Sequence, residues 1–468
     1  MARGIHDILA RYDRCEGAEM RPAIAEQLHK KRIRLVVIDD DPTGIQTVHG
    51  CLLLTDFSPE NVAAALDDQA PFFYMLVNSR AMTEEDARKV VREAVEAVIE
   101  ANRERGYNLL FVSRSDSTLR GHFPAESDTI CDVLKERGLQ PTLPMLFVPA
   151  FFEAGRMTIE GIHYMLNGEE LTPVHKTEFA RDNVFAYHNS YLPDYVVEKG
   201  RGAITAEEVH HIALNELRNL NTEALTATLI EQRTKRCITV DAFDYRDLRL
   251  LSLAVLNLFE KGKSHQTGVI RSSSSLPKAL SGIEEKEYVA AEKGGARGVV
   301  IVGSHVKKST EQLNALLTLE GVEGIEIDVE RILNDDTTQA EELLAHAAKR
   351  YEAGVTPVFY TSRREVRCDD VAKRQALGTK ISHFLVELVR TLPFRPDFLV
   401  SKGGITSHDI LTHSLEVKIA RVAGQAAAGI PTICTTAESR FPEMLYVIFP
   451  GNVGAVDTLR EVVARLKS

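Results

Sequence analysis

Short runs of apolar, largely β-branched residues recur along the chain, and segments of helical or loop-like pattern separate each run from the next. The first half contains RLVVID, FFYMLVN, NLLFVS, MLFVPA, RCITVD and TGVIRS, and the second half contains GVVIVG, GIEIDV, TPVFYTS, DFLVSKG, TICTT and LYVIFPG. The segment EEDARKVVREAVEAVIEANRERG has the apolar spacing of an amphipathic helix and is closed by Gly106. Alternation of buried strands with helices predicts parallel α/β sheets.

Two groups of six apolar runs fit two domains better than one oversized sheet. The segment at residues 281–298 is charged and rich in glycine, and it stands directly before a new buried run. We therefore predict domains at residues 1–285 and 286–468, each with a mainly parallel sheet flanked by helices, and an active site in the cleft between them. Arg271 and the serines at residues 272–275 form either a polar linker or part of the cleft lining, and the sequence leaves both open.

Composition narrows the range of partners. The 468 residues are 44% hydrophobic and 26% charged, as in ordinary globular proteins. A net charge of −11 argues against nucleic acid or an anionic membrane, although a locally basic site can still bind an anionic substrate. No apolar run is long enough to cross a bilayer, and the N-terminal segment lacks the apolar core of a signal peptide. The six cysteines form no Cys-x-x-Cys pair, which favours reduced thiols in a cytoplasmic protein.

Three consecutive carboxylates end the first apolar run. Asp39, Asp40 and Asp41 place like charges close together, which is costly unless water, a cation, a substrate hydroxyl or arginines relieve it. Pro42 and Gly44 hold the chain in a bend and present Asp40 and Asp41 on a loop. A solvated acidic loop is the alternative interpretation.

Other candidate residues also follow apolar runs, and ligands of open α/β sheets bind at the carboxyl ends of strands. After NLLFVS come Arg114, Asp116, Ser117, Thr118 and Arg120; Arg156 comes after MLFVPA, and Glu178, Arg181 and Asp182 come later. Arginines bind carboxylates in bidentate fashion, and carboxylates and hydroxyls bind hydroxyls, so this set suits a small polyhydroxy acid. A surface ion pair is the alternative for each arginine taken singly.

Glycine-bearing turns mark the second half. VSKGGITSHDILTHSL predicts a strand, Gly403 and Gly404, and then a helix with Thr406 or Ser407 as its N-cap. Glycines let the backbone approach a phosphate, and a helix N-terminus offers free N–H donors. VIVGSHVKKSTEQL repeats the pattern with Gly303, Ser304 and a helix that starts near Ser309, and VIFPGNVGAVDTL repeats it with Gly451, Asn452 and Gly454. Three such turns favour a nucleotide phosphate site over glycines needed only for packing, although no P-loop lysine is present.

Taken together, these motifs resemble the four-carbon acid sugar kinase family over nearly the whole chain. The matching elements are Asp-Asp-x-Thr-Gly at residues 40–44, Asp-Ser-Thr-Leu-Arg-Gly at residues 116–121, VPAFFEAGRMTIEGIHY, the VGS turn, GGITS and PGNVG. The resemblance implies an N-terminal sugar-acid domain and a C-terminal ATP domain. It also implies ATP-dependent phosphorylation of a terminal hydroxyl on an acid such as erythronate, threonate or 3-oxo-tetronate. We expect Mg²⁺ to accompany the phosphates of ATP. Pro42, His122 and Ile405 depart from the family pattern, which bears on the substrate more than on the reaction.

Roles follow for individual residues. The resemblance implies nucleotide contacts from Ser304, Gly403, Gly404, Ile405, Thr406, Gly451 and Gly454. From the residues themselves we expect the substrate carboxylate to be bound by Arg120 and Arg156, its hydroxyls to lie near Asp40, Ser117 and Thr118, and Arg114 to serve the acid or the transferred phosphate.

The catalytic base is expected at Asp41 ahead of Asp116. Two carboxylate neighbours should raise the pKa of Asp41, whereas nearby arginines should lower the pKa of Asp116. The alternative is that Asp41 only hydrogen-bonds the hydroxyl.

Other functions remain open at this point. They are a non-catalytic sugar-acid or nucleotide sensor, a kinase of another small polyhydroxy acid, and a dehydrogenase, although no Gly-x-Gly-x-x-Gly follows any apolar run. A homodimer is a common state for such two-domain enzymes, but the sequence does not settle it.

Overall fold

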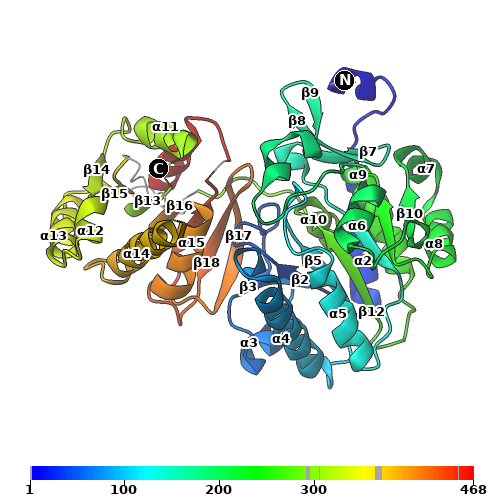
Figure 1. The fold of residues 1–468 in the computed structure, drawn as a ribbon. Helices are drawn as coiled ribbons and strands as arrows, with labels where there is room; N and C mark the ends of the chain where they lie inside the picture. The colour runs from blue at the N-terminus through cyan, green and yellow to red at the C-terminus, as the bar shows by residue number, and fades with distance from the viewer. Residues whose placement is uncertain (1–2, 291–295, 305, 364–370, 452) are drawn as a thin grey trace. The chain divides into compact units, whose positions relative to one another are not determined.

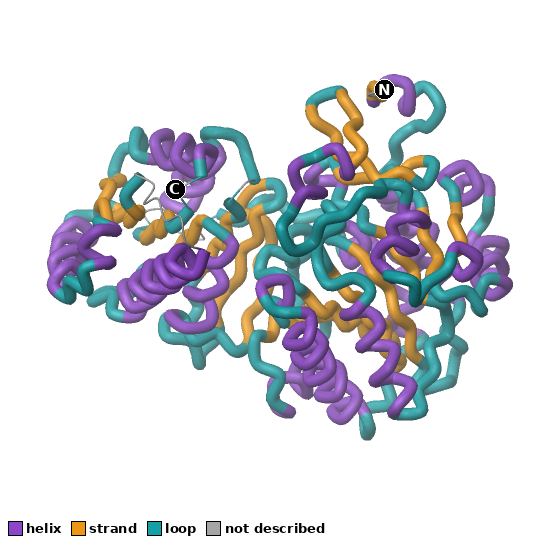
Figure 2. Tube along the Cα trace, viewed as in Figure 1, coloured by secondary structure: helices purple, strands orange, loops and turns teal. Residues whose placement is uncertain are grey.

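The computed structural model describes residues 3–290, 296–304, 306–363, 371–451 and 453–468. The chain divides into two compact units, Met1–Glu285 and Lys286–Ser468. Each unit has a mainly parallel sheet with helices packed on it (Figure 1, Figure 2). The predicted α/β fold is confirmed, since all twelve apolar runs form strands.

The first unit is built on a parallel sheet of eight strands within the part of the chain described. Their order is β10-β11-β6-β12-β5-β2-β4-β3. The bounds are β2 (Ile33–Asp39), β3 (Leu52–Leu54), β4 (Phe72–Leu76), β5 (Asn108–Arg114), β6 (Met145–Val148), β10 (Val209–Ile212), β11 (Cys237–Val240) and β12 (Thr267–Ser272). The register pairs Arg114 with Asp39 on one side and with Ser272 on the other, so these three residues end adjacent strands at the same edge.

Two groups of helices cover this sheet. One group is α3 (Pro59–Asp67), α4 (Glu84–Asn102) and α5 (Ala125–Glu136), and the other is α2 (Arg21–Lys30), α8 (Thr222–Glu231), α9 (Tyr245–Asn257) and α10 (Ser275–Ser281). Helix α4 buries the predicted apolar stripe, including Val91, Val95 and Val98, and its N-cap Thr83 accepts a hydrogen bond from the Asp86 amide. The remaining helices of the unit are α1 (Ile5–Leu9), α6 (Leu192–Gly200) and α7 (Leu214–Asn219).

A small antiparallel sheet also belongs to the first unit. It consists of β1 (Arg3–Gly4), β9 (Glu170–Pro173), β8 (Ile162–Asn167) and β7 (Arg156–Ile159), in that order. Its apolar side forms a core of its own with Ile8, Leu171 and Phe243. The sequence did not predict this sheet, and its first residue on β7 is the candidate Arg156.

The second unit has seven strands within its described residues, in the order β17-β18-β19-β16-β13-β15-β14. The bounds are β13 (Gly298–Val302), β14 (Val322–Ile327), β15 (Thr356–Thr361), β16 (Phe398–Lys402), β17 (Ile419–Ala427), β18 (Ile430–Thr435) and β19 (Leu445–Phe449). The strands from β19 to β14 are parallel, whereas β17, β18 and β19 pair in antiparallel fashion. The run TICTT is therefore a strand, but not one of the parallel set.

Helices pack on this sheet in two groups as well. Helices α11 (Lys307–Leu316) and α16 (Thr458–Lys467) contact each other, and a second group contains α12 (Val329–Leu333), α13 (Thr338–Glu352), α14 (Val371–Arg390) and α15 (Gly404–Asp409). The core joins Val300 and Val400 of the sheet to Leu313 of α11 and Val462 of α16. Among the described residues, no helix has the length and apolarity needed to span a bilayer.

Candidate functional site

The three consecutive carboxylates lie at the carboxyl end of β2. Asp39 and Asp40 are each 1% exposed, whereas the side chain of Asp41 is 21% exposed. Arg114 relieves the repulsion from β5, because its Nη1 lies 3.2 Å from Asp39 Oδ1 and 3.6 Å from Asp40 Oδ1. Gly44 is required by this packing, since a Cβ there would lie 1.8 Å from Asp39 Oδ2. The solvated acidic loop is excluded for Asp39 and Asp40.

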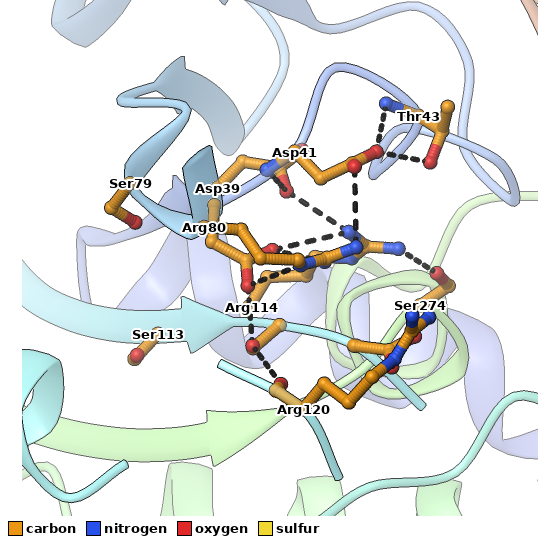
Figure 3. A network of polar contacts seen from close by, with 12 residues as sticks. Asp39, Asp41, Thr43, Ser79, Arg80, Ser113, Arg114, Arg120 and Ser274 are labelled. Carbon is orange, nitrogen blue, oxygen red and sulfur yellow. Dashed lines mark hydrogen bonds and ion pairs between the residues drawn. The ribbon is translucent and has the colours of Figure 1, made fainter. Parts of the chain in front are cut away.

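A second guanidinium group reaches the same carboxylates. Arg80 lies on η2 (Ser79–Ala81), the single turn that follows β4. It donates from Nη2 to Asp40 Oδ1 at 2.5 Å, from Nε to Asp40 Oδ2 at 3.0 Å and from Nη1 to Asp41 Oδ2 at 3.2 Å (Figure 3). Arg80 was not predicted from the sequence, although it follows FFYMLVN closely. Its position at the carboxyl end of an apolar run, like that of Arg114, is the signal that predicts it.

The carboxylates differ in proton affinity. Burial raises the pKa of Asp39 to about 8, and Arg114 offsets it only in part. Burial would also raise the pKa of Asp41, but Arg80, Arg114 and the hydrogen bonds from Thr43 outweigh it and hold that pKa below its usual range. The expectation of a raised pKa for Asp41 is therefore wrong. Its neighbours in sequence are carboxylates, but its charged neighbours in space include two guanidinium groups.

Asp116 lies in the loop after β5. It accepts hydrogen bonds from Thr118 Oγ1 and, at 2.7 Å, from Arg120 Nε. Burial would raise its pKa, but Arg80 and Arg120 outweigh burial and hold the pKa of Asp116 well below the usual range, as predicted. Arg120 Nη1 also lies 3.8 Å from Asp182 Oδ2, and the guanidinium of Arg120 lies over the ring of Phe179.

Arg156 is one of two candidate arginines, with Arg114, whose buried Nε has no hydrogen-bond partner among the described residues. The Nη1 of Arg156 donates to the Ala154 carbonyl. Burial lowers the pKa of Arg156, although the negative charge of Asp116 acts to raise it. A guanidinium group in this condition gains from a carboxylate ligand.

Arg114 also has an Nε without a partner, but it is only 3% exposed and other atoms of its guanidinium are held by neighbouring side chains. Its Nη2 donates to Ser274 Oγ at 2.9 Å and to Gln46 Oε1 at 3.3 Å. The serines at residues 272–275 are buried in β12 and at the start of α10, so the linker interpretation is wrong for them. Among the other predicted hydroxyl ligands, Ser117 is 6% exposed and Thr118 is 2% exposed.

In the second unit, three glycine-bearing turns follow adjacent strands. Lys402, the last residue of β16, pairs with Val302 of β13 and with Phe449 of β19. The turns after these strands begin at Gly303, Gly403 and Gly451. A Cβ on Gly303 would lie 2.3 Å from Thr406 Oγ1, and a Cβ on Gly403 would lie 3.5 Å from Ser304 Cβ. Ser309 Oγ lies within hydrogen-bonding distance of Ser304 Oγ, at 3.0 Å, and of the Gly451 carbonyl, at 3.2 Å, which brings predicted residues of the turns together.

The helix after β16 starts earlier than predicted. Its N-cap is Gly403, at φ 120°, rather than Thr406 or Ser407, and it begins at Gly404. Helix α11 likewise begins at Lys307 instead of near Ser309. The amides of Gly404, Ile405 and Thr406 thus form the first turn, where N–H groups have no partner within the helix.

Space for a ligand exists at this turn. A Cβ on Gly404 would meet no atom within 4 Å, and Ile405 is 75% exposed. Gly454 lies farther along, at φ 84°, and packs against Thr458, whereas Asn452 falls outside the described residues. Free amides, hydroxyls and an uncrowded backbone fit the phosphates of a nucleotide.

Lys402, the last residue of β16, contacts the turn that follows β19. Its side chain is fully buried, and Nζ donates to the carbonyls of Pro450 at 2.7 Å and Gly451 at 3.2 Å. Burial lowers the pKa of Lys402 to about 7. The residue ties the turn after β19 to the end of β16. Within the described parts of the chain, no group of three or more His, Cys, Asp and Glu residues could hold a metal ion.

Comparison with known proteins agrees with this division of chemistry. Residues 35–280 match a family model described as a sugar-binding N-terminal domain, and residues 299–459 match one described as a nucleotide-binding C-terminal domain. The chain belongs to the four-carbon acid sugar kinase family. The family resemblance noted in the sequence is confirmed.

Individual relatives of this sugar acid kinase family member are distant. A D-erythronate kinase from Heliobacterium modesticaldum is 27% identical over 320 residues, which is 66% of this chain and 66%, just under two thirds, of that protein. A Haemophilus influenzae protein of family DUF1537 has a TM-score of 0.66 at 16% identity, over 92% of this chain and 99% of its own. A Salmonella typhimurium LT2 protein, named as a candidate tRNA synthase, has a TM-score of 0.68 at 17% identity, over 92% and 98%. The two structures show a shared fold.

Proposed function

We propose that the chain is an ATP-dependent kinase that phosphorylates the terminal hydroxyl of a four-carbon sugar acid of the threonate, erythronate or 3-oxo-tetronate type. One observation carries the proposal. In the first unit, the partly exposed carboxylate of Asp41 belongs to the same cluster of charges as Asp116 and Arg156, whose Nε lacks a partner. A small acid with several hydroxyls supplies the carboxylate that Arg156 lacks and the hydroxyl that Asp41 would accept from.

The roles of the acid-binding residues follow from their contacts. Arg156 and Arg120 bind the substrate carboxylate, and Ser117 and Thr118 border its hydroxyls. Both oxygens of Asp40 are engaged by Arg80, so Asp40 orients that arginine. Asp41 accepts the proton of the terminal hydroxyl as its oxygen attacks the γ-phosphorus of ATP, and ADP leaves.

ATP is the second substrate. Its phosphates bind the amides of Gly404, Ile405 and Thr406, the hydroxyl of Ser304, and the turn that runs from Gly451 to Gly454. Mg²⁺ bound to these phosphates would neutralise charge during transfer. The described residues offer no dedicated metal cage, so the proposal assigns Mg²⁺ no protein ligand.

Release of ADP with a panel of acids tests the proposal. We expect turnover with at least one stereoisomer of threonate, erythronate or 3-oxo-tetronate, because each combines a carboxylate with a terminal hydroxyl. Erythritol has the hydroxyls but no carboxylate and should give no turnover. Binding of an acid and of ATP with no ADP release from any member of the panel would instead support a sensor.

Replacing Gly404 by valine should raise the KM for ATP by roughly 10- to 100-fold, the cost of losing one or two hydrogen bonds to a charged ligand. The Cβ itself has room, so the fold should persist while the methyl groups crowd the phosphate site. The KM for the acid should change little. Gly378→Val is a matched control, because Gly378 is exposed on α14 and has the same open space. Equal changes in both KM values would mean that the turn is only structural.

A further inference from the structure

Arg80 interacts electrostatically with both carboxylates considered for the role of base, Asp41 and Asp116. Three of its donors are engaged by Asp40 and Asp41, and the charge of Asp116 also acts on it. Its side chain is 19% exposed, so Arg80 is not sealed within the unit. No other guanidinium group described in the structure donates to Asp41.

The turn that carries Arg80 is fixed to β2 through its backbone. The Arg80 amide donates to the Asp40 carbonyl at 3.2 Å, and the amides of Val77 and Asn78 both donate to the Asp39 carbonyl. Asn78, the N-cap of the turn, is left-handed at φ 50°. The main chain before Arg80 is therefore held against the residues that Arg80 binds.

A buried ion pair supports the same turn from inside the unit. Ser79 is fully buried and donates to Glu126 Oε1 at 2.5 Å. Glu126 Oε2 in turn accepts from Arg271 Nη1 at 2.5 Å, and that nitrogen also donates to Ser113 Oγ at 2.9 Å. A buried ion pair often adds little to the stability of the fold, because removing both charges from water costs free energy that their attraction does not fully return. Here it joins η2 to α5, β12 and β5.

We propose that Arg80 is a positioning residue that sets the orientation and charge state of Asp41, and that Ser79, Glu126 and Arg271 hold the turn from which Arg80 reaches it. This inference rests on the proposed function, since it assigns Asp41 the role of base. It also assigns a role to the buried ion pair between Glu126 and Arg271, namely support of the turn that carries Arg80.

The charged groups that face Asp41 are Asp39 and Asp40 on its own segment, Arg80 on η2, Arg114 on β5 and, across Arg80, Asp116. Arg80 is the largest of the influences that lower the pKa of Asp41. Without Arg80, burial and the two neighbouring carboxylates are opposed only by Arg114 and the hydrogen bonds from Thr43. The pKa of Asp41 must then rise, and the base becomes protonated as the pH falls through the new value.

The test compares kcat/KM for the acid from about pH 5 to about pH 8 in the parent and in Arg80→Met. The parent should show no acid limb from Asp41, because its pKa is lowered. Arg80→Met should show such a limb and a kcat lower by about 10²-fold, the cost of misplacing a reacting group by about 1 Å. The KM for ATP should not change. Arg80→Lys restores a cation without the bidentate geometry, so it should remove most of the acid limb and recover only part of kcat.

Ser79→Ala tests the buried support while leaving the ion pair intact. We expect kcat to fall by about tenfold, less than in Arg80→Met, and any acid limb to lie at lower pH than in Arg80→Met, since only one hydroxyl is lost. Ser252→Ala is the matched control, because Ser252 is also a fully buried serine whose hydroxyl makes one hydrogen bond, to the Leu248 carbonyl on α9. Ser252→Ala should leave kcat and the pH dependence of kcat/KM unchanged.

Carboxyl ¹³C NMR titration of Asp41 separates this inference from the proposed function. A parent that turns over no acid of the panel contradicts the proposed function, and the titration then decides the inference alone. A higher Asp41 pKa in Arg80→Met than in the parent supports it. Equal Asp41 pKa values in the two proteins, or a kcat for Arg80→Met within a few-fold of the parent, overturns it.

Discussion

The Asp41→Asn enzyme is expected to lose kcat by about 10²- to 10⁴-fold, the share of the rate that a general base supplies. Asparagine keeps the shape of the side chain and can still accept from Thr43, so both substrates should bind. It cannot take up the proton of the attacking hydroxyl. Single-turnover rates, together with separate binding measurements for the acid and ATP, would distinguish loss of chemistry from loss of binding.

Asp67→Asn is the control for this substitution. Asp67 also accepts hydrogen bonds from an arginine, at 2.7 Å from Arg105 Nη2, but it lies on the exposed side of α3. Its replacement should leave kcat unaltered. If Asp41→Asn kept kcat within a few-fold of the parent, the role of base would pass to Asp116, and Asp116→Asn would become the decisive variant.

Removal of the Arg156 side chain should weaken binding of the acid while ATP binding stays unchanged. Truncating one partner of a buried charge pair costs about 2–5 kcal/mol, which corresponds to about 30- to 5000-fold in Kd. Calorimetry of Arg156→Ala with the best acid of the panel would measure this directly.

Two further variants serve as controls for Arg156→Ala. Arg156→Lys keeps a positive charge but loses the planar fork, so it should bind the acid with intermediate affinity. Arg103→Ala removes an arginine that is 63% exposed and paired with Glu100, and it should have no effect. Unchanged acid binding in Arg156→Ala would mean that this guanidinium serves only the Ala154 carbonyl.

The sequence predicted the strands well because buried parallel strands are short, continuous apolar runs. RLVVID and GVVIVG needed no tertiary information to be recognised. The antiparallel sheet that contains β7 was missed for the opposite reason. RMTIEGIHYML alternates weakly and is only partly buried, so its pairing depends on the rest of the unit.

Most residues of the candidate site could be predicted from the sequence, but the effect of their charges on one another could not. Strand-end reasoning located Asp41, Asp116 and Arg156, and the same reasoning applied to β4 would have located Arg80. The direction of the pKa shift of Asp41 could not be predicted, because it depends on distances between strands that the order of residues does not give. The early start of α15 was missed because Gly403, which favours neither helix nor strand, was not considered as an N-cap.

The close packing of Gly44 on Asp39 restricts how the first acidic motif can vary during evolution. A methyl group at position 44 needs the volume that the Asp39 carboxyl now fills. The two positions are therefore epistatic: a larger residue at 44 becomes acceptable only in a background where residue 39 has already shrunk. Because this constraint arises from packing rather than from ligand contact, an intact glycine in the motif is no evidence that a relative has kept the same substrate.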